Sequence, residues 1–139
     1  MSDSLTNRDA IAIATNWITA SGLPFTSAFI GGSTAYADKK SPYDLTTDID
    51  CYLVTDGELP TQKPGKVSVQ DVLLDVSWMP WSELENAPSD AIVASLLHFG
   101  QVVKDDGRLA ELQKQISRNF EAPAEIHARV ESIRNRIRP

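Results

Sequence analysis

The segment from Thr47 to Val54 limits most strongly how this chain can fold. From residue 49 onward its odd-numbered residues are apolar and share one face of an extended strand, whereas Asp48 and Asp50 share the opposite face. Two carboxylates held side by side repel each other, so such a face is costly unless a cation binds or water solvates it. Hard divalent cations such as Mg²⁺ prefer carboxylate oxygens. The alternation therefore predicts a strand that carries a divalent-metal site.

Other regular elements are predicted on both sides of this strand. The expected strands cover residues 25–30, 67–79 and 101–104, and the expected helices cover residues 7–21, 81–85, 90–99, 107–119 and 124–138. A loop rich in Gly and Pro joins the strand at 47–54 to the strand at 67–79, which indicates a hairpin. Helices before and after a small mixed sheet indicate an α/β fold of the α+β two-layer type.

A third acid, Asp75, lies between two apolar residues of the second long strand. An unpaired charge in such a setting is expensive, so a partner is expected there. If the two long strands are hairpin partners, Asp75 faces the same side as Asp48 and Asp50 and completes a cage for two metal ions. Asp71 shares that face by alternation, but it lies further back along the strand, and a solvated acid is the favoured interpretation.

The first predicted strand ends in a Gly-Gly-Ser turn that contains Gly32 and Ser33. Glycines let the backbone approach a phosphate closely and expose amide groups to it. The Ser33 hydroxyl adds a hydrogen-bonding group, and a helix that starts there adds a favourable dipole. The turn is therefore a candidate phosphate-binding element.

Taken in order along the chain, these features resemble the nucleotidyltransferase superfamily that includes DNA polymerase beta and the bacterial small-molecule and antitoxin-type enzymes. The resemblance covers about residues 25–78. The residues that carry it are Ile30, Gly32, Ser33, Thr47, Asp48, Ile49, Asp50, Leu74, Asp75 and Val76. It implies a polymerase-beta-like fold, in which helices flank a small mixed sheet.

The resemblance also implies an activity. Asp48 and Asp50 would bind two Mg²⁺ ions, and Asp75 would hold the ion beside the acceptor and take its proton. Gly32 and Ser33 would hold the triphosphate of an NTP, with ATP as the favoured donor. An NMP, AMP above all, would pass to a hydroxyl of a small molecule or a protein.

Many relatives carry a basic residue soon after the Gly-Ser pair, whereas residues 34–37 supply none here. Lys39 and Lys40 are therefore the candidate phosphate contacts. Two alternatives stay open. One is a minimal antitoxin-type nucleotidyltransferase that acts on a helical toxin partner, and the other is a nucleotide-binding relative without catalysis.

The length of the chain bears on its domain organisation, and its net charge bears on its partners. The 139 residues indicate a catalytic core over residues 1–105, followed by C-terminal helices over 106–139 that begin a truncated helical domain. The net charge of −6 makes nucleic acid an unlikely partner, because neutralising phosphates drives such binding. Neither a signal peptide nor a membrane-spanning stretch is evident, so a cytoplasmic location is expected. The single cysteine, Cys51, is predicted to be a core thiol.

Overall fold

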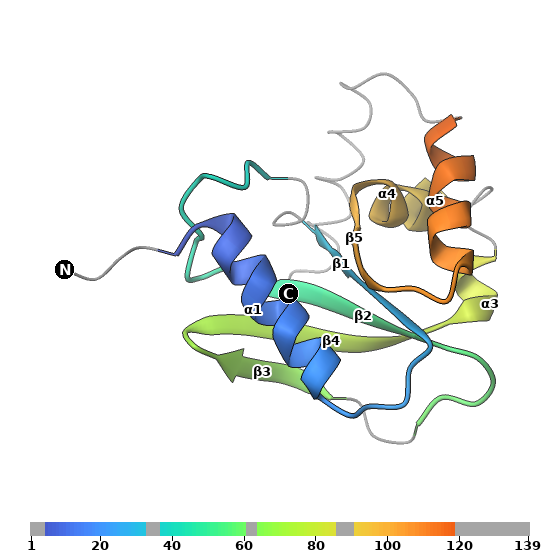
Figure 1. The fold of residues 1–139 in the computed structure, drawn as a ribbon, viewed down its shortest axis with the longest axis horizontal. Helices are drawn as coiled ribbons and strands as arrows, with labels where there is room; N and C mark the ends of the chain where they lie inside the picture. Colours follow the sequence, from blue (N-terminus) through green and yellow to red (C-terminus); the bar gives the residue numbers. More distant parts are fainter. Residues whose placement is uncertain (1–4, 33–36, 61–63, 86–90, 119–139) are drawn as a thin grey trace.

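The computed structural model describes residues 5–32, 37–60, 64–85 and 91–118. Five strands form one sheet in the order β3-β4-β2-β1-β5 (Figure 1). The strands are β1 (Ser27–Gly31), β2 (Ile49–Thr55), β3 (Gly65–Val69), β4 (Val72–Pro80) and β5 (Gln101–Lys104). The helices of the described ranges are α1 (Asn7–Ala20), α3 (Trp81–Leu84), α4 (Ala91–Phe99) and α5 (Arg108–Arg118). The predicted class, a mixed sheet flanked by helices, is confirmed.

The pairing of the two long strands differs from the prediction. The predicted strand at 67–79 divides at Gln70 and Asp71, whose φ angles of 48° and 69° make the tight turn of a β3–β4 hairpin. Strand β2 is instead a parallel neighbour of β4, so the expected hairpin between residues 47–54 and 67–79 is wrong. The apolar alternation runs close to the turn on both sides, at Val69 and Val72, and so it does not reveal the break.

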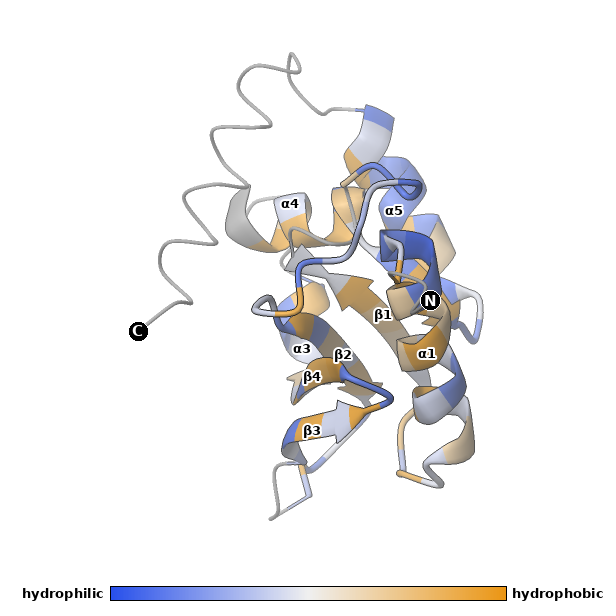
Figure 2. Cartoon of the chain, turned by 90° about the vertical axis from the view of Figure 1, so that its left-hand side faces the viewer, coloured by the Kyte–Doolittle hydropathy of each residue, from blue (hydrophilic) through white to orange (hydrophobic). Residues whose placement is uncertain are grey.

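Helices cover both faces of the sheet, and this corrects the expected two-layer arrangement. Helix α1 packs on one face, where the buried residues of β2 and β4 are Ile49, Cys51, Leu53, Val72, Leu74 and Val76. Helices α3, α4 and α5 contribute to a second core on the other face, together with Phe29, Val54 and Met79. Figure 2 shows the three layers edge on. Strand β2 has apolar side chains on both sides, so both of its faces need cover.

Helix α1 begins with a capping box that also anchors the segment before β2. The Thr6 hydroxyl accepts a hydrogen bond from the Asp9 amide at 3.1 Å, and the Asp9 carboxylate accepts one from the Thr6 amide at 3.0 Å. The amides of Asn7 and Arg8 donate to the carbonyls of Ser41 at 2.9 Å and Lys39 at 3.0 Å. The start of α1 therefore holds the polar segment that leads into β2.

Several sequence expectations are confirmed to within a few residues. Helices α1, α3, α4 and α5 and strands β1, β2 and β5 all overlap their predicted ranges. Cys51 is fully buried, as predicted, and burial raises the pKa of its thiol to about 12. The helix predicted over residues 124–138 and the turn residue Ser33 lie outside the described residues. Among the described helices, none is both long and apolar enough to cross a membrane.

Candidate metal and phosphate site

Asp50 and Asp75 are direct partners across the parallel pair of β2 and β4. Neighbouring strands lie about 4.8 Å apart, and in-register residues project from the same face. Burial is the main cause that raises the pKa of the Tyr52 phenol and of the Cys51 thiol. The negative charges of Asp50 and Asp75 raise both pKa values further. Like charges on neighbouring strands repel each other. A cation between them would relieve this repulsion.

Asp48 stands immediately before β2 and meets a cation from another strand. The Lys66 ammonium lies 3.1 Å from the Asp48 carboxylate, with side-chain exposures of 63% and 27%. Lys66 belongs to β3, where its partner across the β3–β4 hairpin is Asp75. The hydrogen bond to Asp48 is the main cause that raises the Lys66 pKa, and the charges of Asp48, Asp75 and Asp50 add to it. The Lys66 ammonium therefore interacts electrostatically with all three carboxylates.

Gly32, in the candidate phosphate turn, lies against the carboxylate of Asp50. Its φ of 77° lies in the left-handed region, and a Cβ placed on it would sit 2.6 Å from the Asp50 Oδ2 atom. Gly31 is the cross-strand partner of Asp50 in the β1–β2 pair. A Cβ on Gly31 would lie 2.9 Å from a ring carbon of Tyr52. The backbone at Gly31 and Gly32 can thus lie close to Tyr52 and Asp50 because neither glycine has a Cβ.

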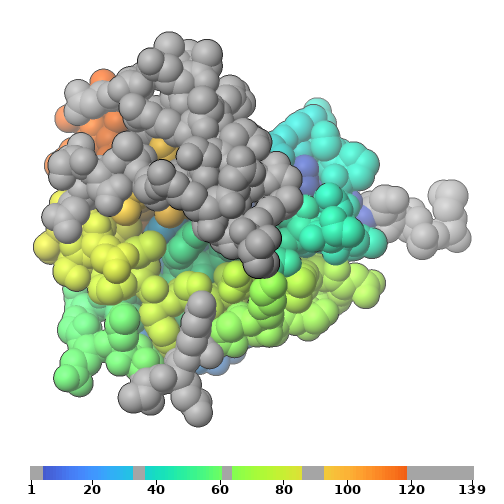
Figure 3. Space-filling view, turned by 180° about the vertical axis from the view of Figure 1, so that it is seen from behind, coloured from blue at the N-terminus to red at the C-terminus, as the bar shows by residue number. Residues whose placement is uncertain are grey.

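The site lies on the sheet face opposite α1. Asp50 alternates with the core residues Ile49 and Cys51, which face α1, so its side chain projects from the other face. Figure 3 shows that face, on which residues 37–48 lie beside strands β3 and β4. The Tyr43 hydroxyl of this segment donates to the Thr47 carbonyl, which fixes the entry into β2 just before Asp48.

The other candidate residues named from the sequence lie on two turns. Lys39 and Lys40 belong to the turn that docks on the start of α1, and burial lowers the pKa of the Lys39 amine. Asp71 occupies the exposed β3–β4 turn, which agrees with its interpretation as a solvated acid. The basic group observed beside the acids is Lys66, a residue that sequence reasoning missed. Only the hairpin register, set by the turn at Gln70 and Asp71, places it opposite Asp75.

The donor set fits a hard divalent cation that arrives with a phosphate ligand. Within the described ranges, no group of three or more His, Cys, Asp or Glu side chains is gathered tightly enough to hold a metal ion by itself. Mg²⁺ commonly takes one or two carboxylates and fills its other positions with water and substrate phosphates. Asp48 and Asp50 offer such oxygens, Lys66 supplies a positive charge beside Asp48, and the missing Cβ of Gly32 lets its backbone lie against the Asp50 carboxylate.

Comparison with known proteins adds no relative. No protein-family model matches this chain, and no curated protein matches it.

Proposed function

We propose that the chain is a divalent-metal-dependent nucleotidyltransferase that moves an NMP from an NTP to a hydroxyl acceptor. The observation that carries the proposal is the approach of Gly32 to Asp50, with Asp75 in register beside it. The glycine turn lies against the Asp50 carboxylate, and Asp75 is the in-register neighbour of Asp50 on β4. A metal-bound nucleoside triphosphate fits both features, because its phosphates suit a glycine turn and its Mg²⁺ suits the carboxylates.

Each residue then has a role that follows from its position. Asp48 and Asp50, at the start of β2, would hold the metal, and the backbone at Gly32 would approach the phosphates. Bound Mg²⁺ would supply activation of the acceptor oxygen and charge neutralisation for the leaving pyrophosphate. Asp75 lies on β4, one strand nearer the sheet edge formed by β3, and it would receive the acceptor proton.

The transfer balances without a further reactant. The acceptor oxygen forms a bond to the α-phosphorus, and the bond between that phosphorus and the pyrophosphate oxygen breaks. The electron pair leaves with pyrophosphate, while the acceptor proton passes to the carboxylate of Asp75. We favour ATP as the donor and a small molecule or protein as the acceptor, since the net charge of −6 disfavours nucleic acid.

Label transfer tests the proposal. The protein is incubated with Mg²⁺ and each of ATP, CTP, GTP and UTP labelled at the α-phosphate, alone and with cell lysate. Transfer is expected with the wild type, and it should be lost in Asp48→Asn and Asp50→Asn, which keep the side-chain size. Equal transfer by the wild type and both variants would show that the catalytic assignment is wrong. Metal-dependent nucleotide binding without any transfer would identify a non-catalytic nucleotide-binding protein instead.

A further inference from the structure

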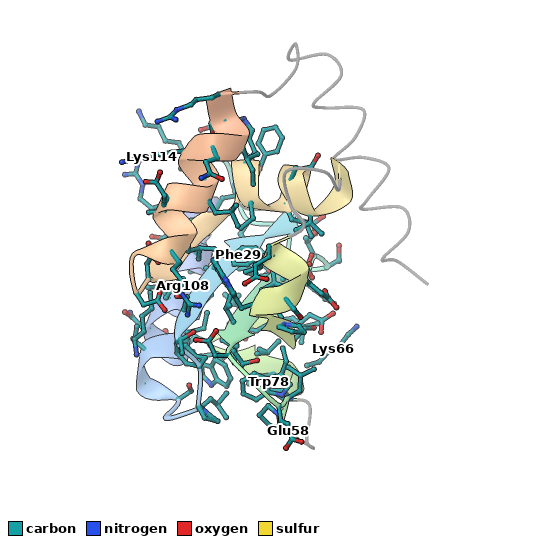
Figure 4. All side chains as sticks on the ribbon, turned by 90° about the vertical axis from the view of Figure 1, so that its right-hand side faces the viewer. Phe29, Glu58, Lys66, Trp78, Arg108 and Lys114 are labelled. Atoms are coloured by element: carbon teal, nitrogen blue, oxygen red, sulfur yellow. The ribbon has the colours of Figure 1, made fainter. Side chains whose placement is uncertain are left out.

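Lys66 is the basic residue that the candidate site holds in direct contact. It lies on β3, the edge strand of the sheet, and its ammonium reaches across β4 to Asp48 at the start of β2. Figure 4 shows its side chain at the β3 edge, well away from Arg108 and Lys114. With 63% of its side chain exposed, Lys66 has room to change rotamer.

The ion pair between Lys66 and Asp48 is weak enough for another cation to replace the ammonium. Ion pairs between exposed side chains contribute about 0.2–1 kcal/mol, because water solvates both charges well. Asp48 is more enclosed, with 27% exposure, and it belongs to the carboxylate face where a cation relieves repulsion. A divalent cation carries twice the charge of an ammonium group and can therefore replace it on this carboxylate.

Released from Asp48, the ammonium would stay beside the incoming phosphates. The backbone of Lys66 is fixed by the β3–β4 ladder opposite Asp75, so the side chain can swing only within reach of the same face. A lysine ammonium is a point charge that suits phosphate oxygens. Residues 34–37 contain no basic side chain, so a phosphate-binding cation must come from another part of the fold.

We propose that Lys66 is an exchangeable counter-ion, which neutralises Asp48 when metal is absent and moves to the nucleotide phosphate when metal takes the carboxylate. This inference rests on the proposed function, because it assumes that metal and nucleotide meet on this face. It assigns to β3 a positioning residue for the triphosphate. The lysine has opposite effects on the two ligands: it competes with the metal alone and assists the metal–nucleotide complex.

The test compares Lys66→Met with Lys114→Met in the full chain. Each variant removes one positive charge, and Lys114 is exposed on α5 far from the carboxylate face. Binding of Mn²⁺ alone is measured by electron paramagnetic resonance, and binding of ATP at saturating Mn²⁺ is measured by calorimetry.

Lys66→Met should bind Mn²⁺ up to about fivefold more tightly than the wild type, since the competing ion pair is gone. It should bind ATP about tenfold more weakly, as expected for the loss of a charge-assisted hydrogen bond. Lys114→Met should match the wild type in both assays.

Tighter Mn²⁺ binding together with weaker ATP binding in Lys66→Met identifies Lys66 as the exchangeable counter-ion. Unchanged or weaker Mn²⁺ binding in Lys66→Met overturns the inference, and so does unchanged ATP binding. If those results come from a wild type that transfers label and loses transfer in Asp50→Asn, only the inference fails and the proposed function stands. If neither the wild type nor Lys66→Met binds Mn²⁺ or ATP, both fail together.

Discussion

Asp50 and Asp75 are in-register partners across the parallel pair of β2 and β4, and this relationship places the two acids side by side on one face of the sheet. Strand β3 lies between β2 and β4 along the chain, so the two acids come from strands that are neighbours in the sheet but not consecutive in the sequence. The core on the α1 side packs against the alternate residues of both strands, which directs both carboxylates to the opposite face. The packing of the core therefore sets the geometry of the site.

Asp75 and Asp71 allow a matched comparison on one hairpin. Asp75→Asn should abolish metal-dependent label transfer, because a neutral amide neither takes a proton nor attracts a metal as a carboxylate does. Asp71→Asn should transfer label as the wild type does, since Asp71 is exposed in the turn and Asn tolerates its φ of 69°. Comparable loss in both variants would mean that the hairpin as a whole, and not the Asp75 carboxylate, supports transfer.

Gly32 is predicted to be essential for the site rather than for the fold alone. Gly32→Ala should lose metal-dependent ATP binding, because the added Cβ would lie 2.6 Å from the Asp50 Oδ2 atom. The control is Gly22→Ala, at a similar φ of 71° with nothing within 4 Å of the added Cβ. It should cost only roughly 1–2 kcal/mol of unfolding free energy from backbone strain and leave ATP binding intact. ATP binding by Gly32→Ala at wild-type affinity would contradict the close approach.

Arg108 should give the protein an acid-sensitive contribution to stability. Its guanidinium lies 2.7 Å from the Asp56 carboxylate and 2.6 Å from the Asp106 carboxylate, and these bonds hold both carboxyl pKa values below their usual range. A lowered folded-state pKa means that the contribution is present above about pH 4 and is lost as the pH falls through the lowered pKa.

Urea unfolding of Arg108→Met as a function of pH measures this contribution. The variant should be less stable than the wild type at neutral pH, and the difference should shrink between about pH 4 and pH 2. The ring of Trp81, 4.5 Å from the guanidinium carbon, adds a contact that does not depend on the carboxylates and leaves a residual difference. Lys114→Met serves as the control for the removal of one charge. A difference that stays constant down to pH 2 would contradict the assigned role of the two carboxylates.

The capping box of α1 should contribute to global stability. Thr6→Ala removes the hydroxyl that accepts from the Asp9 amide, and it should lower the free energy of unfolding by about 1 kcal/mol. Thr19→Ala is the matched control, because the exposed Thr19 hydroxyl bonds back to the carbonyl of Thr15 at 3.1 Å within the helix. That substitution should be neutral or slightly stabilising, since alanine is the better helix former. Equal effects of the two substitutions in chemical denaturation would argue against the cap.

Local sequence patterns predicted the elements well because each pattern acts over a few residues. The Thr6 cap and the apolar stripe of α1 are examples, and the alternation around Asp48 and Asp50 is another. The parallel pairing of β2 with β4 was missed, because strand order depends on contacts between distant segments. Asp75 was nevertheless expected on the correct face, since alternation against the core decides the face whatever the direction of the neighbour. Lys66 was not predicted as a site residue, because its position opposite Asp75 depends on the turn at residues 70–71. The apolar alternation of the sequence does not reveal that turn.

Metal-dependent nucleotide binding tests the central claim most directly. Calorimetry measures ATP binding to the wild type and to Asp50→Asn, each with Mg²⁺ and with Mg²⁺ removed by a chelator. The account predicts that the wild type binds ATP only when Mg²⁺ is present and that Asp50→Asn binds it at least about tenfold more weakly. Circular dichroism is expected to show the same fold for both proteins. Equal ATP binding by the two proteins, or binding that is unchanged when Mg²⁺ is removed, would contradict the assignment of this face as a metal–nucleotide site.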